Sequence, residues 1–144
     1  MSLALRTSVN EIVRSHLREA YPEEGCGVLI GTESNGTRVI ERAEPLANQR
    51  QDSKANRYSI SPEQLLLAER EARARELDIV GFFHSHPDHP PVPSAFDLEH
   101  AWPFYSYLIV SVVAGTVGEA RSWRLAEDRT AFEPETLELW PDAI

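Results

Sequence analysis

The sequence of 144 residues predicts a single-domain α/β fold, in which a mixed β-sheet is flanked by helices. Short apolar runs such as CGVLIG (26–31) and DIVGFFHS (78–85) have the length and composition of buried strands. These runs alternate along the chain with segments of helical periodicity. No linker, internal repeat or low-complexity segment divides the sequence, so we expect one domain over residues 1–144.

The first half of the chain is expected to contain one helix and three strands, the last of them brief. Residues 8–21 have apolar positions at helical spacing, and Ser8 and Glu11 at their start match a capping box. Strands follow at 26–31 and 37–46, joined by a turn at Asn35-Gly36. Residues 47–57 are polar and aperiodic and are predicted to form a loop, which leads into a brief strand, RYSI (57–60).

The second half begins with a strong helix signal. Ser61 is placed as the N-cap, Pro62 as the first helical residue and Gln64 as the capping partner of a helix that runs to about Glu76. The predicted elements that follow are a strand (78–85), a proline-rich loop, a short helix (94–101) and paired strands (105–113 and 119–126). The tail TAFEPETLELW (130–140) is compatible with one more strand.

The composition excludes several classes of partner. The formal net charge is -9 and Lys and Arg form no cluster, which argues against nucleic acid or an anionic membrane surface. The single cysteine, Cys26, permits no intramolecular disulfide, so a reducing cytoplasm is the expected location. The N-terminus lacks the apolar stretch of a signal peptide, and runs such as LIVSVVAG (108–115) are too short to cross a bilayer.

The segment HSHPDHPPVPSAFD (84–97) carries the residues best suited to chemistry. His84 and His86 alternate at the end of a predicted strand and therefore point to the same face. Asp97 follows after eleven residues, and a loop with one helical turn can bring its carboxylate back to the histidines. Two imidazoles and one carboxylate bind zinc with one position left for water, as catalytic zinc sites do. Ser94 is close enough in sequence to donate to a developing oxyanion.

The same segment has simpler interpretations. A His-x-His pair alone is a weak signal, and the four prolines can serve only to stiffen a surface loop. Ser94 and Asp97 also match a helix capping box, which needs no metal. His89 and His100 are alternative ligands, or else solvated side chains.

Other residues near this segment are open to two interpretations each. The residues alone leave several candidates for the general base that a catalytic water requires, namely Glu23, Glu24, Asp88 and Glu99. Cys26 begins an apolar run and fits a small buried side chain better than a ligand or nucleophile. Asn48 and Ser53 lie in the polar loop, where a substrate tail could pass, although the sequence gives no firm reason for this role. Four aromatic residues could line a groove or pack in the core: Trp102, Phe104, Tyr105 and Tyr107.

Two motifs together resemble the JAMM/MPN+ zinc metalloprotease family. The first is His84-Ser-His86-Pro87, with seven residues between His86 and Ser94 and two more before Asp97. The second is Glu24-Gly-Cys-Gly, which opens an apolar strand as the segment with the catalytic glutamate of that family does. The resemblance covers about residues 8–125 and implies the MPN architecture, which is cytidine-deaminase-like.

The resemblance also implies a mechanism and a substrate. His84, His86 and Asp97 would bind one zinc ion per chain together with the catalytic water, Glu24 would act as general base and then acid, and Ser94 would stabilise the intermediate. The family hydrolyses peptide or isopeptide bonds, often after the C-terminal Gly-Gly of a ubiquitin-like protein.

The short chain is similar to compact prokaryotic members of the family, which implies the tail of a ubiquitin-like or sulfur-carrier protein as partner. A non-catalytic MPN-type interaction or scaffold domain and a zinc amidohydrolase for small-molecule amides are the alternatives. The oligomeric state stays open.

Overall fold

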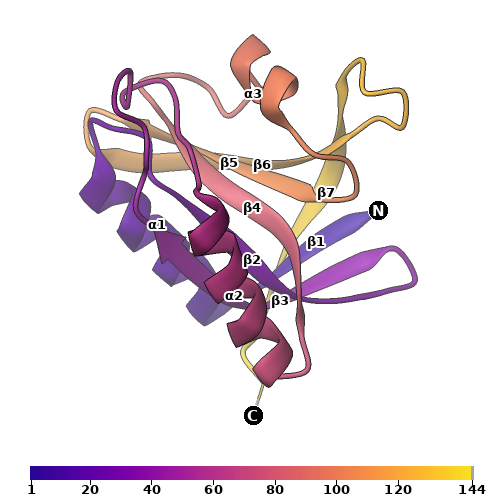
Figure 1. Cartoon of the computed structure of the whole chain (residues 1–144). Helices are drawn as coiled ribbons and strands as arrows, with labels where there is room; N and C mark the ends of the chain where they lie inside the picture. The colour runs from indigo at the N-terminus through magenta and orange to yellow at the C-terminus, as the bar shows by residue number, and fades with distance from the viewer. Residues whose placement is uncertain (144) are drawn as a thin grey trace.

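The computed structural model describes residues 1–143. Figure 1 shows a strongly curved sheet with one helix at its top edge and two longer helices along its sides. The elements are, in chain order, β1 (Ser2–Arg6), α1 (Thr7–Ala20), β2 (Cys26–Ser34), β3 (Thr37–Leu46), α2 (Pro62–Ala74), β4 (Asp78–Pro87), α3 (Ala95–His100), β5 (Ser106–Val113), β6 (Thr116–Leu125) and β7 (Phe132–Trp140).

The sheet closes on itself in the strand order β1-β3-β2-β4-β5-β6-β7. β1 makes the closure because it pairs in parallel with both β3 and β7. β4 and β5 are also parallel, whereas the remaining neighbours are antiparallel. The predicted mixed sheet flanked by helices is therefore confirmed. The finer likeness to cytidine deaminases stays a prediction.

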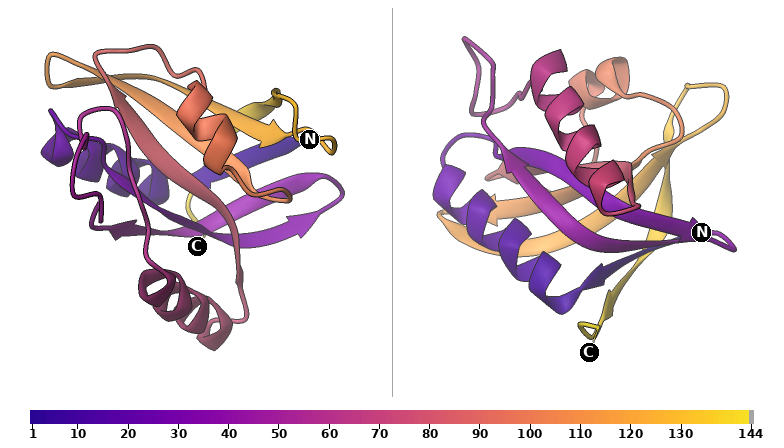
Figure 2. Two further views of the ribbon diagram at one scale, coloured as in Figure 1. Left: turned by 45° about the horizontal axis from the view of Figure 1, so that its top comes forward. Right: turned by 60° about the horizontal axis from the view of Figure 1, so that its bottom comes forward.

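The two long helices lie on opposite faces of the sheet. The right-hand view of Figure 2 shows β2 and β3 between α1 and α2. Successive side chains of β4 point to opposite faces of the sheet. Phe83 therefore packs in the core beneath α1, and Phe82 packs in the core beneath α2. The α1 core includes Val9, Val13, Leu17, Leu29 and Leu108, and the α2 core includes Val28, Ile30, Ala68, Ala72 and Tyr107.

Most of the predicted elements are present, with shifts at their ends. Strand β3 has the predicted bounds, and the Asn35-Gly36 turn is confirmed by positive φ angles of 53° and 81° at its two residues. The capping box of α2 is also confirmed, because Ser61 accepts from the Gln64 amide and the Gln64 side chain accepts from the Ser61 amide. β1 was not predicted.

Two local predictions were wrong. Helix α1 begins at Thr7 and has no side-chain cap. Ser8 instead binds the far end of the chain, since its amide and its hydroxyl both donate to Asp142 Oδ1, at 3.0 and 2.8 Å. Residues 57–60 form no strand. The Ser59 amide donates to the side chain of Asn48, so it is not available for pairing with a neighbouring strand.

Candidate active site

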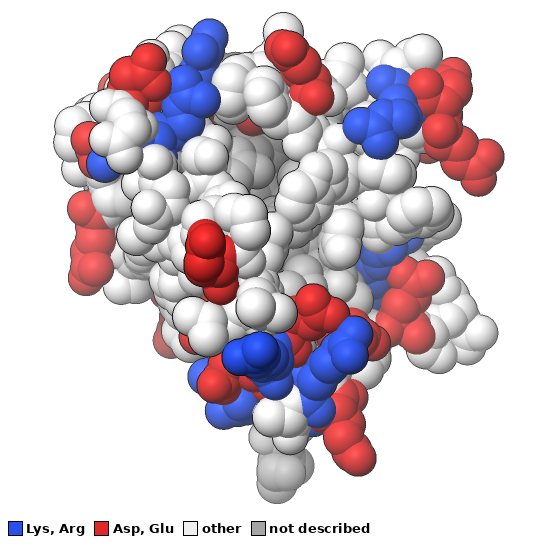
Figure 3. Space-filling view, viewed as in Figure 1, with Lys and Arg blue, Asp and Glu red and all other residues white. Residues whose placement is uncertain are grey.

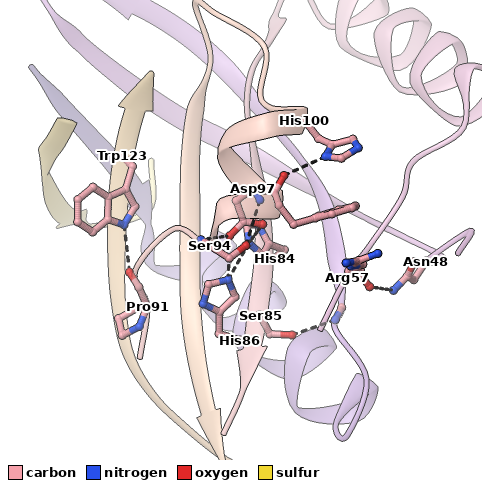
Figure 4. A network of polar contacts seen from close by, with 12 residues as sticks. Asn48, Arg57, His84, Ser85, His86, Pro91, Ser94, Asp97, His100 and Trp123 are labelled. Atoms are coloured by element: carbon pink, nitrogen blue, oxygen red, sulfur yellow. Dashed lines mark hydrogen bonds and ion pairs between the residues drawn. The ribbon is translucent and has the colours of Figure 1, made fainter. Parts of the chain in front are cut away.

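Three predicted ligands converge where β4 faces α3. The Nε2 atoms of His84 and His86 lie 3.3 Å apart, on the face of β4 that also carries Phe82. Asp97 reaches both rings, with Oδ1 3.4 Å from His84 Nε2 and Oδ2 3.0 Å from His86 Nε2. One donor atom from each residue lies within 4.8 Å of the others. Figure 4 shows the three side chains directed at a common point.

The proline-rich loop between β4 and α3 is held by its backbone carbonyl groups. The Pro90 carbonyl lies 3.0 Å from His86 Nδ1, and the Pro91 carbonyl accepts from Trp123 Nε1 at 3.0 Å. The Ser111 hydroxyl donates to the His89 carbonyl at 2.7 Å. Strands β5 and β6 thus fix the path by which the chain returns Asp97 to the histidines.

Ser94 and Asp97 form the capping box that the sequence also suggested. The Asp97 amide donates to Ser94 Oγ at 3.0 Å, and Asp97 Oδ2 accepts from the Ser94 amide at 2.9 Å. The cap uses Ser94 Oγ only as an acceptor, and none of the hydrogen bonds within residues 1–143 uses its proton. Capping α3 and donating to a substrate are therefore compatible roles for this hydroxyl.

The donor set fits a divalent metal. Two facing imidazole nitrogens and a carboxylate are a ligand set that zinc takes in catalytic sites. Burial raises the pKa of Asp97, but the nearby His84 and the hydrogen bonds from both rings outweigh it and hold the pKa well below its usual range. The His86 ring is oriented from behind by the Pro90 carbonyl, as metal-binding histidines usually are. His84 Nδ1 is buried and finds no partner within the described chain.

Glu24 lies buried beside this group. Its side chain belongs to a residue only 3% exposed, and Oε1 has no hydrogen-bond partner among residues 1–143. Burial raises the pKa of Glu24 to about 7, although His84 and His86 act to lower it. A carboxyl group with this pKa can both accept and release a proton near neutral pH.

The backbone beside Glu24 is fastened to β4 between the two histidines. The Gly25 amide donates to the Ser85 hydroxyl at 2.9 Å, and the Ser85 amide donates to the Gly25 carbonyl at 3.1 Å. Glycine fits the close approach to α1 at this point, because a Cβ on Gly25 would lie 2.9 Å from the Cβ of Ala20 and 2.8 Å from a methyl carbon of Leu17. The position of Glu24 is therefore set by the contact of Gly25 with α1 and by its two hydrogen bonds to β4.

The other candidate bases lie elsewhere. Glu23 and Glu99 are exposed. Asp88 is also exposed, and its carboxylate accepts from the Tyr21 hydroxyl and the Ala114 amide. Among the four candidates, Glu24 alone is buried at the site.

The remaining polar candidates do not join the metal-binding group. His89 is exposed, and His100 is exposed with its ring stacked on Phe96 at a centroid distance of 4.0 Å. Cys26 is fully buried, and burial raises the pKa of its thiol to about 12, which disfavours the thiolate that a ligand or nucleophile needs.

An apolar pocket of about 210 Å³ adjoins the ligands. Its wall includes His84 and Asp97, and Trp102 and Tyr107 are the two predicted aromatic residues that line it. Phe104, in contrast, is 84% exposed and lies outside the lining. Figure 3 shows the hollow beneath α3 and above α2, surrounded mainly by uncharged side chains.

Sequence reasoning missed two residues that shape the site. Ser85 could be placed on the opposite face of β4 from its neighbours, but nothing in the sequence identified Gly25 as its partner. Tyr58 stacks on His84 with a centroid distance of 4.5 Å and an interplanar angle of 26°. It was assigned to a strand, and no local pattern marks such a long-range contact.

The closed mixed sheet carries a buried His-His-Asp group that could hold a metal ion, and this is the kind of ligand set found in zinc hydrolases. The family model described as prokaryotic homologs of the JAB domain matches residues 6–126. The chain belongs to this family, and its resemblance to the JAMM/MPN+ proteins is thereby confirmed.

Individual relatives agree with this assignment. A desampylase of Haloferax volcanii is 38% identical over 114 residues, which cover 76% of this chain and 80% of the relative. A CysO-cysteine peptidase of Mycobacterium tuberculosis is 32% identical over 133 residues, which cover 92% of this chain and 88% of the relative. A solved structure from Desulfitobacterium hafniense has a TM-score of 0.85 and 32% identity, covering 97% of this chain and 94% of that one.

No helix within residues 1–143 combines the length and the apolar character needed to span a membrane.

Proposed function

We propose that this chain is a zinc-dependent peptidase that hydrolyses peptide or isopeptide bonds after the C-terminal Gly-Gly of a ubiquitin-like or sulfur-carrier protein. One observation carries the proposal: His84, His86 and Asp97 converge within 3.0–3.4 Å of one another beside the buried carboxyl group of Glu24. The related desampylase and CysO-cysteine peptidase support the choice of substrate class.

His84, His86 and Asp97 are the residues that would hold the zinc ion. A zinc ion bound there would polarise the scissile carbonyl group and lower the pKa of a coordinated water. Asp97 suits this role because its carboxylate stays ionised, and its orientation is set by the amide of Ser94.

Glu24 is proposed as the general base and then the general acid. Its carboxylate accepts a proton from the attacking water and passes that proton to the departing amine. Burial raises the pKa of Glu24 in the metal-free chain, which favours a carboxyl group able to hold the proton that it has accepted. The unpartnered Oε1 leaves one carboxylate oxygen available for the water.

Ser94 is proposed as the donor to the developing oxyanion. Its Oγ accepts from the Asp97 amide in the helix cap, which orients the hydroxyl while its proton remains to be donated. A fixed donor of this kind stabilises charge that develops only in the transition state.

The finer assignments rest on the same reasoning. We propose one domain over residues 1–144, one zinc ion per chain and a cytoplasmic location, which the single buried cysteine supports. The architecture is proposed to be cytidine-deaminase-like. An acidic chain without a basic cluster also supports a protein partner over nucleic acid.

Cleavage of a defined conjugate tests the proposal. The zinc-loaded protein is mixed with a small ubiquitin-like carrier whose C-terminal Gly-Gly is joined either to a lysine side chain or to one further amino acid. Mass spectrometry should detect the free carrier ending in Gly-Gly, and a chelator should abolish the reaction until zinc is added back. Failure to bind zinc would favour a scaffold domain, and cleavage of small amides alone would favour an amidohydrolase.

A further inference from the structure

The side chain of Asn48 is fully hydrogen-bonded within the chain. Its Nδ2 donates to the carbonyl groups of Glu24 at 3.1 Å and of Arg57 at 3.0 Å. Its Oδ1 accepts from the amides of Arg50 and Ser59, both at 3.1 Å. A carboxamide has two donor hydrogens and two acceptor lone pairs, so all four are used. Asn48 thus has no hydrogen-bonding capacity left for the substrate tail that the sequence suggested.

These bonds fix one loop, residues 48–59, which we call the Asn48 loop. Figure 4 shows Asn48 beside the Arg57 backbone at one end of this loop. The Asn48 loop contacts the backbone of Glu24, the ligand His84 and helix α3. Tyr58 stacks on His84, and the Arg57 guanidinium lies 4.6 Å from the ring of Phe96 in α3, the helix that carries Asp97.

The contact with Glu24 is the most direct. Glu24 precedes β2 and lies outside any helix or strand. Its amide donates to the Lys54 carbonyl at 2.6 Å, and its carbonyl accepts from Asn48 at 3.1 Å. Both backbone polar groups of Glu24 therefore bond to the Asn48 loop, and the same loop packs on a ligand of the metal-binding group.

We propose that Asn48 is a positioning residue, which holds Glu24 in register with His84 and Asp97 by locking the Asn48 loop. The inference rests on the proposed function, since it assigns Glu24 the role of base. Asn48 itself touches neither substrate nor metal. Its loss frees the Glu24 carbonyl from the loop, so the carboxyl group is no longer kept where it can take a proton from the attacking water. The three ligands keep their own supports on β4 and α3.

A matched pair of variants separates this role from a general effect on the loop. Asn48→Ala removes the four bonds, and Asn48→Asp keeps the two acceptor bonds but loses both donor bonds, to the carbonyl groups of Glu24 and Arg57. Asn56→Ala is the control, since Asn56 lies in the same loop with an exposed side chain that makes no hydrogen bond within residues 1–143.

The first readout needs neither metal nor substrate. Amide hydrogen exchange, measured by NMR on the metal-free protein, should be at least about tenfold faster at Glu24 in both Asn48 variants. The Ser59 amide should lose protection in Asn48→Ala but keep most of it in Asn48→Asp. Exchange at Phe83 in β4 should be unchanged, and Asn56→Ala should match the wild type throughout. Unchanged exchange at Glu24 in Asn48→Ala would overturn the proposal.

The second readout is the division between kcat and KM on the carrier conjugate. Asn48→Ala should lower kcat about tenfold or more, with KM little changed and stoichiometric zinc retained. A raised KM with normal kcat would mean that Asn48 contacts the substrate. Loss of bound zinc, accompanied by faster amide exchange at Phe83, would mean a purely structural role. Either result overturns the proposal. An inactive wild type would refute the proposed function, and exchange at Glu24 would still decide whether Asn48 positions it.

Discussion

The hydroxyl of Ser85 accepts a hydrogen bond from the amide of Gly25 at 2.9 Å. This bond joins the residue between the two histidines to the residue after Glu24, so the ligands and the proposed base share one point of attachment. Both partners are buried. Together with the bond from the Ser85 amide to the Gly25 carbonyl, this hydroxyl on the opposite face of β4 helps to set the relative position of the two halves of the site.

Replacing Ser85 with alanine should lower activity more than it lowers zinc binding. The Gly25 amide would be left buried without this partner, at a cost of about 1–3 kcal/mol in the free energy of unfolding. We expect a reduced kcat with near-stoichiometric zinc. Ser106→Ala is the control, because that equally buried hydroxyl accepts from Arg38 and lies apart from the ligands. An equal loss of kcat in both variants would show that the effect is only one of stability.

Ser94→Ala should separate the two roles of the Ser94 hydroxyl when it is compared with Ser61→Ala. Each substitution removes one capping box and should cost about 1 kcal/mol of stability. Only Ser94 faces the proposed oxyanion, so kcat should fall roughly a hundredfold in Ser94→Ala alone. Zinc content is measured in parallel. A wild-type kcat in Ser94→Ala would leave Ser94 as a helix cap and nothing more.

The stability of the metal-free protein should depend on pH through Glu24. The folded-state pKa is about 7 against an ordinary value of 4.5, so the protonated form favours the folded state. The contribution of protonated Glu24 to the stability of the fold is fully present below pH 4.5 and is lost as the pH rises through 7. Glutamine carries no charge at any pH, so Glu24→Gln avoids the cost of burying a carboxylate. At pH 8 this variant should therefore be more stable than the wild type, by up to about 3 kcal/mol in the free energy of unfolding. Urea unfolding at pH 8 and pH 4 checks this, and an equal difference at both pH values would contradict it.

Replacing Pro90 and Pro91 together with glycine should weaken zinc binding by roughly tenfold, because a more flexible loop must be ordered when Asp97 meets the histidines. Glycine keeps the two carbonyl groups that bind His86 and Trp123, so only the stiffness of the loop changes. Zinc affinity is measured by competition with a chelator. Pro134→Gly, at an exposed position on β7, should bind zinc as the wild type does. An unchanged affinity in the double variant would leave the prolines as ordinary loop residues.

Local patterns in the sequence predicted the parts of the fold whose partners are near in the chain. The Ser61 cap, the Asn35-Gly36 turn and the buried runs of β2 and β4 all depend on neighbours in sequence. The errors involve distant partners. Ser8 binds Asp142, and sheet closure needs β1 to meet β7 at the other end of the chain. Periodicity cannot reveal either contact.

The same division applies to the site. Alternation placed His84 and His86 on one face, and the capping pattern placed Ser94 beside Asp97. The choice of Glu24 came from the resemblance to a family, because four acidic residues were equal candidates on local grounds. Its burial and its attachment to the Asn48 loop exist only in the folded chain.

The central claim is that Glu24 transfers the proton in a zinc-dependent cleavage after Gly-Gly. The most direct test compares wild type and Glu24→Gln, each loaded with one zinc ion per chain, on the carrier conjugate at pH 7.5. The account predicts that the variant keeps its zinc and loses about 100- to 10,000-fold in kcat/KM. Full activity in a zinc-loaded Glu24→Gln protein would contradict the mechanism.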